Sequence, residues 1–299
     1  MTQPTAKTVL VTGASRGIGL LTARTLAACG HHVFAGMRDI SGRNREAAQA
    51  LQKSAAGAGY SLRVVELDVT SEHDCTRVAA EIELERSLDV LVNNAGIMPV
   101  GVTEAFSLEK MRACFDVNMF GLATMSQAVL PAMRKRREGL LINISSSAGR
   151  LAIPYFGVYC ASKWAMEAWS ESLNYELAPF NIQSVLIEPS GHATDLVNTA
   201  PSPDRSGTLD SYGPHAAGRE KMLGMFLDLF EQGHAGNDAR NVADRIIELV
   251  EMTGERPLRT QVGDDMGVAA INEATAPIQS GLIEQLSDVY AVAPGHEDA

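Results

Sequence analysis

The feature that most constrains the fold is a regular alternation of short apolar runs and longer helical patterns. The apolar runs are rich in Val, Ile and Leu, and the stretches between them show helical spacing. Strands that are apolar on both faces and separated by helices pair in parallel, and the helices cover both sides of the sheet. We therefore predict an α/β fold with a doubly wound parallel sheet, whose strands lie at residues 8–11, 33–37, 62–67, 90–92, 140–144 and 184–187.

The composition is that of one globular domain. Hydrophobic residues make up 45% of the 299 residues and charged residues 20%, so one large core can form. No repeat, low-complexity block or linker divides the chain, which predicts a single domain over residues 1–299. The formal net charge of -11 disfavours a nucleic-acid partner, because such proteins normally carry a basic excess.

The cysteines and the chain start bear on cellular location. Cys29, Cys75, Cys114 and Cys160 are scattered and form no C-x-x-C pair, which predicts reduced thiols and no metal site. Residues 1–7 are short and polar, unlike a signal peptide. No apolar run approaches the roughly 18 residues of a membrane span. We expect a cytoplasmic protein without a membrane segment.

A glycine-rich sequence, T-G-A-S-R-G-I-G, follows the first strand at residues 12–19. Glycines at a strand–helix junction allow a tight turn and let a pyrophosphate approach the positive end of the helix. The residues predicted to contact a dinucleotide here are Gly13, Ser15, Arg16, Gly17, Ile18 and Gly19.

This turn and the motifs after it resemble the short-chain dehydrogenase/reductase family. Asp68 and Val69 follow the third strand, and N-N-A-G follows the fourth at residues 93–96. The likeness covers about residues 8–196 and is similar to the 17β-hydroxysteroid dehydrogenase-like and carbonyl-reductase branches. It implies a Rossmann-type fold, a nicotinamide dinucleotide cofactor, and cofactor contacts from Asp68, Val69, Asn94, Ala95 and Gly96.

Tyr159 and Lys163 are the strongest catalytic candidates. Residues four apart share one helix face, so both side chains can reach one cleft. A phenol with a pKa of about 10 is a poor acid or base near neutrality unless a nearby cation favours its phenolate. Lys163 supplies that cation, and the resemblance places it on the nicotinamide ribose as well.

The resemblance also assigns a serine and an asparagine. The family's serine usually lies thirteen residues before the tyrosine, which selects Ser146 from the run at residues 145–147. Ser145 and Ser147 are expected to be turn residues, with Ser147 the alternative. Asn118 matches the family's fourth catalytic member, which holds a water in a proton relay to the lysine.

The turn after the sixth strand is expected to reach the nicotinamide through Pro189, Gly191 and Thr194. Ser190 occupies the position where the family has glycine, so the contacts to the carboxamide stay open. His192 is expected to line the cleft and not to act as a base, because Tyr159 fills that role.

The second strand bears on the choice of cofactor. NAD-specific enzymes carry an acidic residue after this strand, which binds the ribose 2′-hydroxyl. Here Met37 takes that position, Arg38 follows, and Arg16 lies in the glycine-rich turn. Guanidinium groups favour a 2′-phosphate, so we expect NADP(H), with NAD(H) possible through Asp39.

The predicted activity is the NADP(H)-dependent interconversion of a ketone or aldehyde and an alcohol, with Tyr159 as acid or base. The alternatives are an NAD-dependent alcohol or hydroxysteroid dehydrogenase and a non-catalytic dinucleotide-sensing regulator. The partner is a small carbonyl or alcohol substrate, and the apolar helix after Tyr159 predicts a homodimer or homotetramer.

Residues 195–230 interrupt the alternation of strands and helices. A stretch rich in Pro, Ser and Gly leads to an amphipathic helix at about residues 217–230 that carries Met222, Met225, Phe226, Leu227 and Phe230. A flexible stem and an apolar helix are what a closing substrate lid requires, since closure must exclude water from the reaction. We predict that this segment is the mobile wall of the substrate site.

Overall fold

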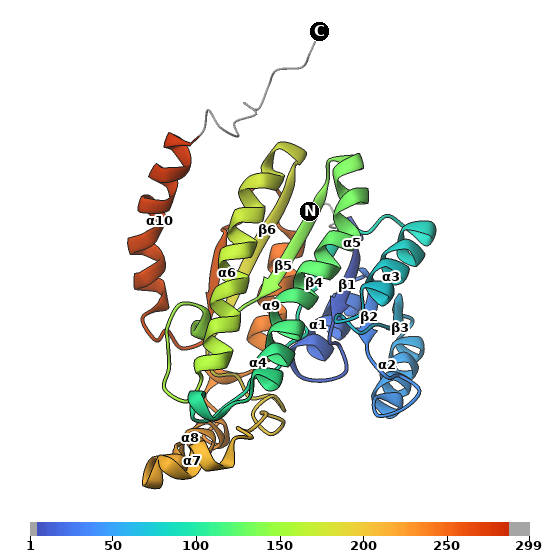
Figure 1. The fold of residues 1–299 in the computed structure, drawn as a ribbon. Helices are drawn as coiled ribbons and strands as arrows, with labels where there is room; N and C mark the ends of the chain where they lie inside the picture. Colours follow the sequence, from blue (N-terminus) through green and yellow to red (C-terminus); the bar gives the residue numbers. More distant parts are fainter. Residues whose placement is uncertain (1–4, 287–299) are drawn as a thin grey trace.

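The protein is built around one parallel sheet, seen in a computed structural model that describes residues 5–286 (Figure 1). Seven strands lie in the order β3-β2-β1-β4-β5-β6-β7, and all their pairings are parallel. The order reverses between β1 and β4, which opens a crevice beyond the carboxyl ends of these strands. The doubly wound Rossmann-type sheet predicted from the sequence is confirmed. The strands are β1 (Thr8–Thr12), β2 (His32–Met37), β3 (Leu62–Glu66), β4 (Val90–Asn93), β5 (Gly139–Ile144), β6 (Ile182–Pro189) and β7 (Arg259–Val262).

Helices cover both faces of the sheet and form two cores. Val9 and Val11 of β1 belong to the core beneath one set of helices, whereas Leu10 belongs to the core on the opposite face. The first core packs against α1 (Gly17–Ala28), α2 (Arg45–Ala58) and α9 (Arg240–Glu251). The second core packs against α3 (Glu72–Glu85), α5 (Gly121–Arg136) and the end of α6 (Gly157–Leu177).

The sequence prediction missed one strand. β7 pairs with β6, so that Leu186 lies opposite Arg259 and Pro189 opposite Val262. Its sequence, R-T-Q-V, is mostly polar and lacks the apolar run that marked the other strands. β7 is the last strand of the sheet and only Val262 in it is buried, so its other positions do not require apolar side chains.

The remaining helices lie at the periphery. α4 (Leu108–Phe115) packs against α6, and α10 (Val268–Gln285) follows β7 along the outside of the molecule. α7 (Ser206–Ser211) and α8 (Gly218–Glu231) lie together beyond one end of the sheet (Figure 1). Among residues 5–286, no helix combines the length and apolarity that crossing a bilayer requires.

Candidate active site

The glycine-rich turn between β1 and α1 brings the backbone close to the loop after β4. Gly13 and Gly17 have φ angles of +66° and +56°, which favour glycine. A Cβ on Gly13 would lie 2.8 Å from Ala95 Cα, and one on Gly19 would lie 2.4 Å from Asn94 Nδ2. α1 begins with no acidic residue in its first turn, so its positive end remains available to an anion.

Thr12 and Asn94 fix this turn. Asn94 Nδ2 donates to the Thr12 carbonyl at 2.8 Å and to the Gly13 carbonyl at 3.2 Å. The backbone N–H groups of Asn94 and Ala95 both donate to Thr12 Oγ1 at 3.0 Å. The Asn94 side chain therefore holds the two strand ends together, a role that the sequence did not reveal.

One cavity of about 710 Å³ lies beyond the carboxyl ends of the strands. It brings together the residues that sequence reasoning assigned to the cofactor and three of the four assigned to catalysis. These lining residues are Gly13, Ser15, Arg16, Gly17, Ile18, Gly19, Arg38, Asp68, Val69, Asn94, Ala95, Gly96, Ser146, Tyr159, Lys163, Pro189, Gly191 and Thr194.

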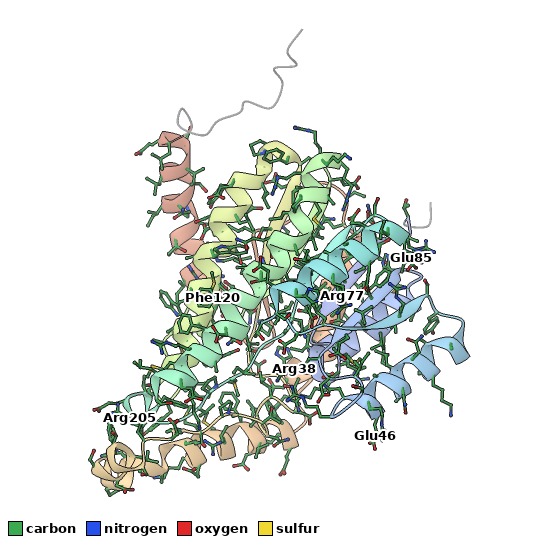
Figure 2. The ribbon with its side chains drawn as sticks, turned by 45° about the vertical axis from the view of Figure 1, so that its right-hand side comes forward. Arg38, Glu46, Arg77, Glu85, Phe120 and Arg205 are labelled. Atoms are coloured by element: carbon green, nitrogen blue, oxygen red, sulfur yellow. The ribbon has the colours of Figure 1, made fainter. Side chains whose placement is uncertain are left out.

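Three arginines line this cavity, and the Arg16 guanidinium donates from Nη2 to Thr199 Oγ1 at 3.3 Å. Arg16 and Arg38 line it as expected, and Arg43 joins them from the segment before α2, which the sequence analysis did not assign. Arg38 lies at the end of the sheet nearest α7 and α8 (Figure 2). Asp39 does not line the cavity: its Oδ2 accepts from the Arg43 backbone N–H at 3.0 Å. Its backbone N–H donates to Glu66.

Tyr159 and Lys163 lie on one face of α6 and are both buried. Lys163 Nζ lies 5.8 Å from the centroid of the Tyr159 ring and donates to the Ile144 carbonyl at 2.6 Å. Burial raises the pKa of Tyr159, while its hydrogen bond with Ser146 acts in the opposite direction. The phenol is therefore protonated at neutral pH, in the form that donates a proton.

The three consecutive serines have different surroundings. Ser146 precedes a short helical turn, where its Oγ accepts from the Ala148 N–H at 3.1 Å, and its hydroxyl reaches Tyr159. Ser147 is buried, and its Oγ donates to the Pro189 carbonyl at 3.3 Å. Ser145 is also buried, beside Glu167. This geometry favours Ser146 as the serine that contacts a substrate oxygen.

Asn118 is the one expected catalytic residue that does not line the cavity. It lies in a π-helical turn, Asp116–Phe120, between α4 and α5. Its Oδ1 accepts from the Ile97 N–H at 2.8 Å, and its Nδ2 donates to the Ile97 carbonyl at 2.9 Å and to Ser162 Oγ at 2.9 Å. The side chain is thus committed to the protein, and a water relay would have to use the backbone.

The turn after β6 lines one side of the cavity. Thr194 lies near the glycine-rich turn, because a Cβ on Gly17 would be 3.5 Å from Thr194 Cβ. His192 is buried, its Nδ1 lies 3.0 Å from the Ser190 carbonyl, and burial lowers its pKa. A neutral, buried imidazole agrees with the expected lining role.

Aromatic and aliphatic side chains form the other end of the cavity. Phe226 of α8 packs edge-on against Phe156, with ring centroids 5.8 Å apart, and Phe230 lies 6.1 Å from Phe226. Met225 and Leu227, named above among the apolar residues of this helix, are exposed to solvent. Since α8 presents one face to the cavity, neighbours of Phe226 along the chain fall on the other side.

The stem that leads to α8 is pinned along its length. Lys110 Nζ donates to the Ser202 carbonyl at 2.6 Å, and Asp204 accepts from the Ser107 hydroxyl at 2.7 Å. The backbone N–H of Val100 donates to the Pro201 carbonyl at 3.1 Å. Residues 195–205 lack regular structure, as expected from their composition, but they are tied to the segment after β4.

Comparison with known proteins assigns the family. The family model described as short chain dehydrogenase matches residues 7–204. The chain is 36% identical to bovine (Bos taurus) retinol dehydrogenase 8 over 264 residues, which are 85% of this chain and 80% of the relative. It is 32% identical to 3-ketodihydrosphingosine reductase of Bacteroides thetaiotaomicron over 256 residues, 85% of this chain and 87% of the relative.

A solved short-chain dehydrogenase from Streptomyces avermitilis superposes with a TM-score of 0.72 at 29% identity, covering 97% of this chain and 98% of that one. The chain belongs to the short-chain dehydrogenase family. It is an oxidoreductase that acts on an alcohol or carbonyl group, with a nicotinamide dinucleotide as cofactor.

Proposed function

We propose that this enzyme is an NADP(H)-dependent reductase of a ketone or aldehyde carried on a bulky apolar molecule. The observation that carries the proposal is one cavity in which the three catalytic candidates lie between two different kinds of lining. Ser146, Tyr159 and Lys163 lie between an end lined by guanidinium groups and an end lined by aromatic rings. The first end fits a phosphorylated dinucleotide and the second fits an apolar substrate.

The side chains suit general acid catalysis of carbonyl reduction. When bound, the nicotinamide supplies the hydride. The hydroxyls of Ser146 and Tyr159 hold the substrate oxygen, and Tyr159 donates its proton to that oxygen. The Lys163 ammonium stabilises the phenolate that remains, because it lies close to the Tyr159 ring. A water relay that returns a proton to Tyr159 through Lys163 would use the backbone of Asn118.

The preference for NADP(H) rests on charge. Arg16, Arg38 and Arg43 line the cavity where the adenosine ribose is expected, and the alternative partner Asp39 is turned toward its own loop. Guanidinium groups bind phosphate through two parallel hydrogen bonds, whereas a ribose 2′-hydroxyl would need a carboxylate. NAD(H) remains the alternative.

The apolar substrate class rests on the lining of the opposite end. Met98, Ile153, Phe156, Phe226 and Phe230 belong to one cluster around Tyr159. Apolar and aromatic lining with few polar groups is typical of sites for hydrophobic ligands. The names of the relatives, a retinol dehydrogenase and a 3-ketodihydrosphingosine reductase, agree with such a substrate.

We further propose that residues 195–230 form a substrate lid that moves at α8. Tyr155 has a φ of +67°, its hydroxyl donates to the His215 carbonyl at 3.3 Å, and its ring fills the space beside Gly218. A Cβ on Gly218 would lie 1.9 Å from this ring. Because hydrogen bonds hold residues 195–205 in place and Tyr155 packs at Gly218, the opening movement is confined to α8.

We also propose a homodimer or homotetramer assembled through α6 and the π-helical turn that precedes α5. Trp164 is 49% exposed and Phe120 56% exposed, and Figure 2 shows Phe120 at the surface. Covering such side chains with a second copy removes apolar surface from water. Light scattering should give a multiple of the 31.9 kDa chain mass, and Trp164→Arg should lower it. A wild-type mass of one chain at micromolar concentration would contradict the assembly.

The activity is tested by NADPH oxidation with a panel of carbonyl compounds. We expect turnover with a steroid, retinoid or long-chain ketone and little with acetone or acetaldehyde. NADH should support a lower kcat/KM with the same substrate. Turnover confined to small polar carbonyls would refute the substrate class, and equal kcat/KM with both cofactors would refute the preference for NADPH.

A further inference from the structure

A buried charge cluster lies next to the catalytic helix. Glu167 and Glu171 extend from α6, Glu188 from β6 and Arg259 from β7. The Arg259 guanidinium lies 3.1 Å from Glu167 Oε2, 2.6 Å from Glu171 Oε2 and 3.4 Å from Glu188 Oε1. Glu167 is 2% exposed and Glu188 is 0% exposed, so water screens these charges poorly.

The cluster holds more carboxylates than cations. Arg259 contacts all three carboxylates, and Arg150 adds a second positive charge nearby. Burial raises the pKa of Glu188 to about 7, and repulsion from Glu167 adds to this effect. Asn272 Nδ2 donates to Glu188 Oε2 at 2.5 Å. Glu188 is therefore largely protonated below neutrality. Burial raises the pKa of Glu167 as well, while the Ser145 hydroxyl and the Arg259 guanidinium act in the opposite direction.

Glu167 connects this cluster to the catalytic residues in two ways. It follows Lys163 by four residues on α6 and so lies on the same face of the helix. It also packs against the segment that carries Ser146: a Cβ on Gly149 would lie 2.6 Å from Ser145 Oγ and 3.2 Å from Glu167 Oε1. The absence of a side chain at Gly149 is what lets the carboxylate reach this segment.

We propose that Glu167 is a positioning residue of this active site. Its carboxylate, held by Arg259 of the last strand, maintains the positive charge on Lys163 and fixes the segment that presents Ser146. The proposal rests on the proposed function only in that it takes charged Lys163 to assist Tyr159. It assigns a role to Arg259 of β7, which does not line the cavity.

The surroundings of Lys163 support this role. Burial lowers the pKa of Lys163 to about 8, and Cys114 and Glu167 act in the opposite direction. Burial also raises the pKa of the Cys114 thiol, so that group is neutral at physiological pH. The negative charge of Glu167, which Arg259 favours against burial, is then the neighbouring charge that opposes the loss of the lysine proton.

The test titrates Lys163 in the apoprotein by NMR, with carbon-13 at the lysine Cε and the resonance assigned by its loss in Lys163→Met. Removing an anion one helical turn away should lower the pKa of Lys163, so Glu167→Gln should titrate about one pH unit below the wild type. Glu167→Asp, which keeps the charge, should restore most of the difference. The matched control is Glu171→Gln, because Glu171 binds the same arginine but lies one turn farther from Lys163.

Arg259→Met provides the second arm. Without the guanidinium, Glu167 should take up a proton, and Lys163 should titrate as in Glu167→Gln. Thermal melts at pH 6 identify any variant that fails to fold. The proposal is overturned if folded Glu167→Gln titrates as the wild type does, or if Glu171→Gln shifts Lys163 by the same amount.

The activity arm separates this proposal from the proposed function. In the wild type, carbonyl-dependent NADPH oxidation should decline at alkaline pH as Lys163 loses its proton, and in Glu167→Gln the decline should begin at lower pH. The KM for NADPH at pH 6 should not change. A wild type with no carbonyl reduction refutes the proposed function, while the NMR titration still decides whether Glu167 maintains the lysine charge.

Discussion

The two ends of the cavity are built in different ways. The dinucleotide end is made largely of backbone, drawn together by glycines and by Thr12 and Asn94, whose hydrogen bonds span 2.8–3.2 Å. The substrate end is made of side chains such as Met98, Phe156 and Phe226, which come from segments far apart in the chain. Backbone geometry admits few substitutions, whereas apolar packing admits many of similar volume.

This difference explains why the sequence predicts the ligand of the dinucleotide end but not the ligand of the substrate end. Close approach at Gly13 and Gly19 imposes glycine at fixed spacing, so the ligand class can be recognised from a motif. Apolar residues of α8 could equally belong to a core, and their pattern does not specify a substrate. The catalytic residues lie between the dinucleotide end and the substrate end. Tyr159 packs in the apolar cluster, while Lys163 donates a hydrogen bond to the last residue of β5.

The largest expected effect concerns this boundary. Tyr159→Phe removes the proton-donating oxygen and little else, so kcat should fall by about a hundredfold or more. Affinity for NADPH, measured by fluorescence titration, should stay near the wild-type value because the dinucleotide end is untouched. Ser146→Ala should also lose most activity, whereas Ser147→Ala, whose hydroxyl bonds to Pro189, should keep it.

The opposite pattern for the two serines would show that the substrate oxygen binds one residue farther along the turn. A Tyr159→Phe variant with more than about a tenth of the wild-type kcat would remove this residue from the proton-transfer step. Loss of NADPH affinity in the same variant would show that the two ends are not independent.

Much of the architecture followed from the sequence, and what did not has physical causes. Apolar runs predicted β1 to β6, because central strands are buried on both faces. Polar β7 carries no such signal. Glu167 and Arg259 lie far apart in sequence, so only the folded chain reveals their ion pair, and Arg43 belongs to no motif that would mark it as a lining residue. The helical register showed that Tyr159 and Lys163 share a face, but not that Asn118 turns away.

The second effect tests the dinucleotide end alone. Arg16→Ala combined with Arg38→Ala should reduce the ratio of kcat/KM for NADPH over NADH by at least tens- to a hundredfold, since a single charge-assisted hydrogen bond contributes about 1.5–3 kcal/mol. Arg45→Ala is the matched control, because Arg45 is exposed at the start of α2, two residues after Arg43, but does not line the cavity. An unchanged ratio in the double variant would transfer the role to Arg43 or exclude a 2′-phosphate contact.

The smallest effect tests the substrate end alone. Phe226→Ala removes apolar surface that faces the cavity and should raise KM for a bulky apolar ketone about tenfold, the equivalent of about 1.4 kcal/mol of lost burial. Met225→Ala is the matched control, since Met225 is its neighbour on α8 and is 54% exposed. Neither variant should change the affinity for NADPH. Equal effects of the two variants on KM would mean that α8 contributes only to stability.

Hydrogen exchange tests whether residues 195–230 close over the substrate. Exchange over this segment should slow when an apolar substrate analogue joins the cofactor, because closure buries α8. Unchanged exchange in the ternary complex would make the segment a fixed wall.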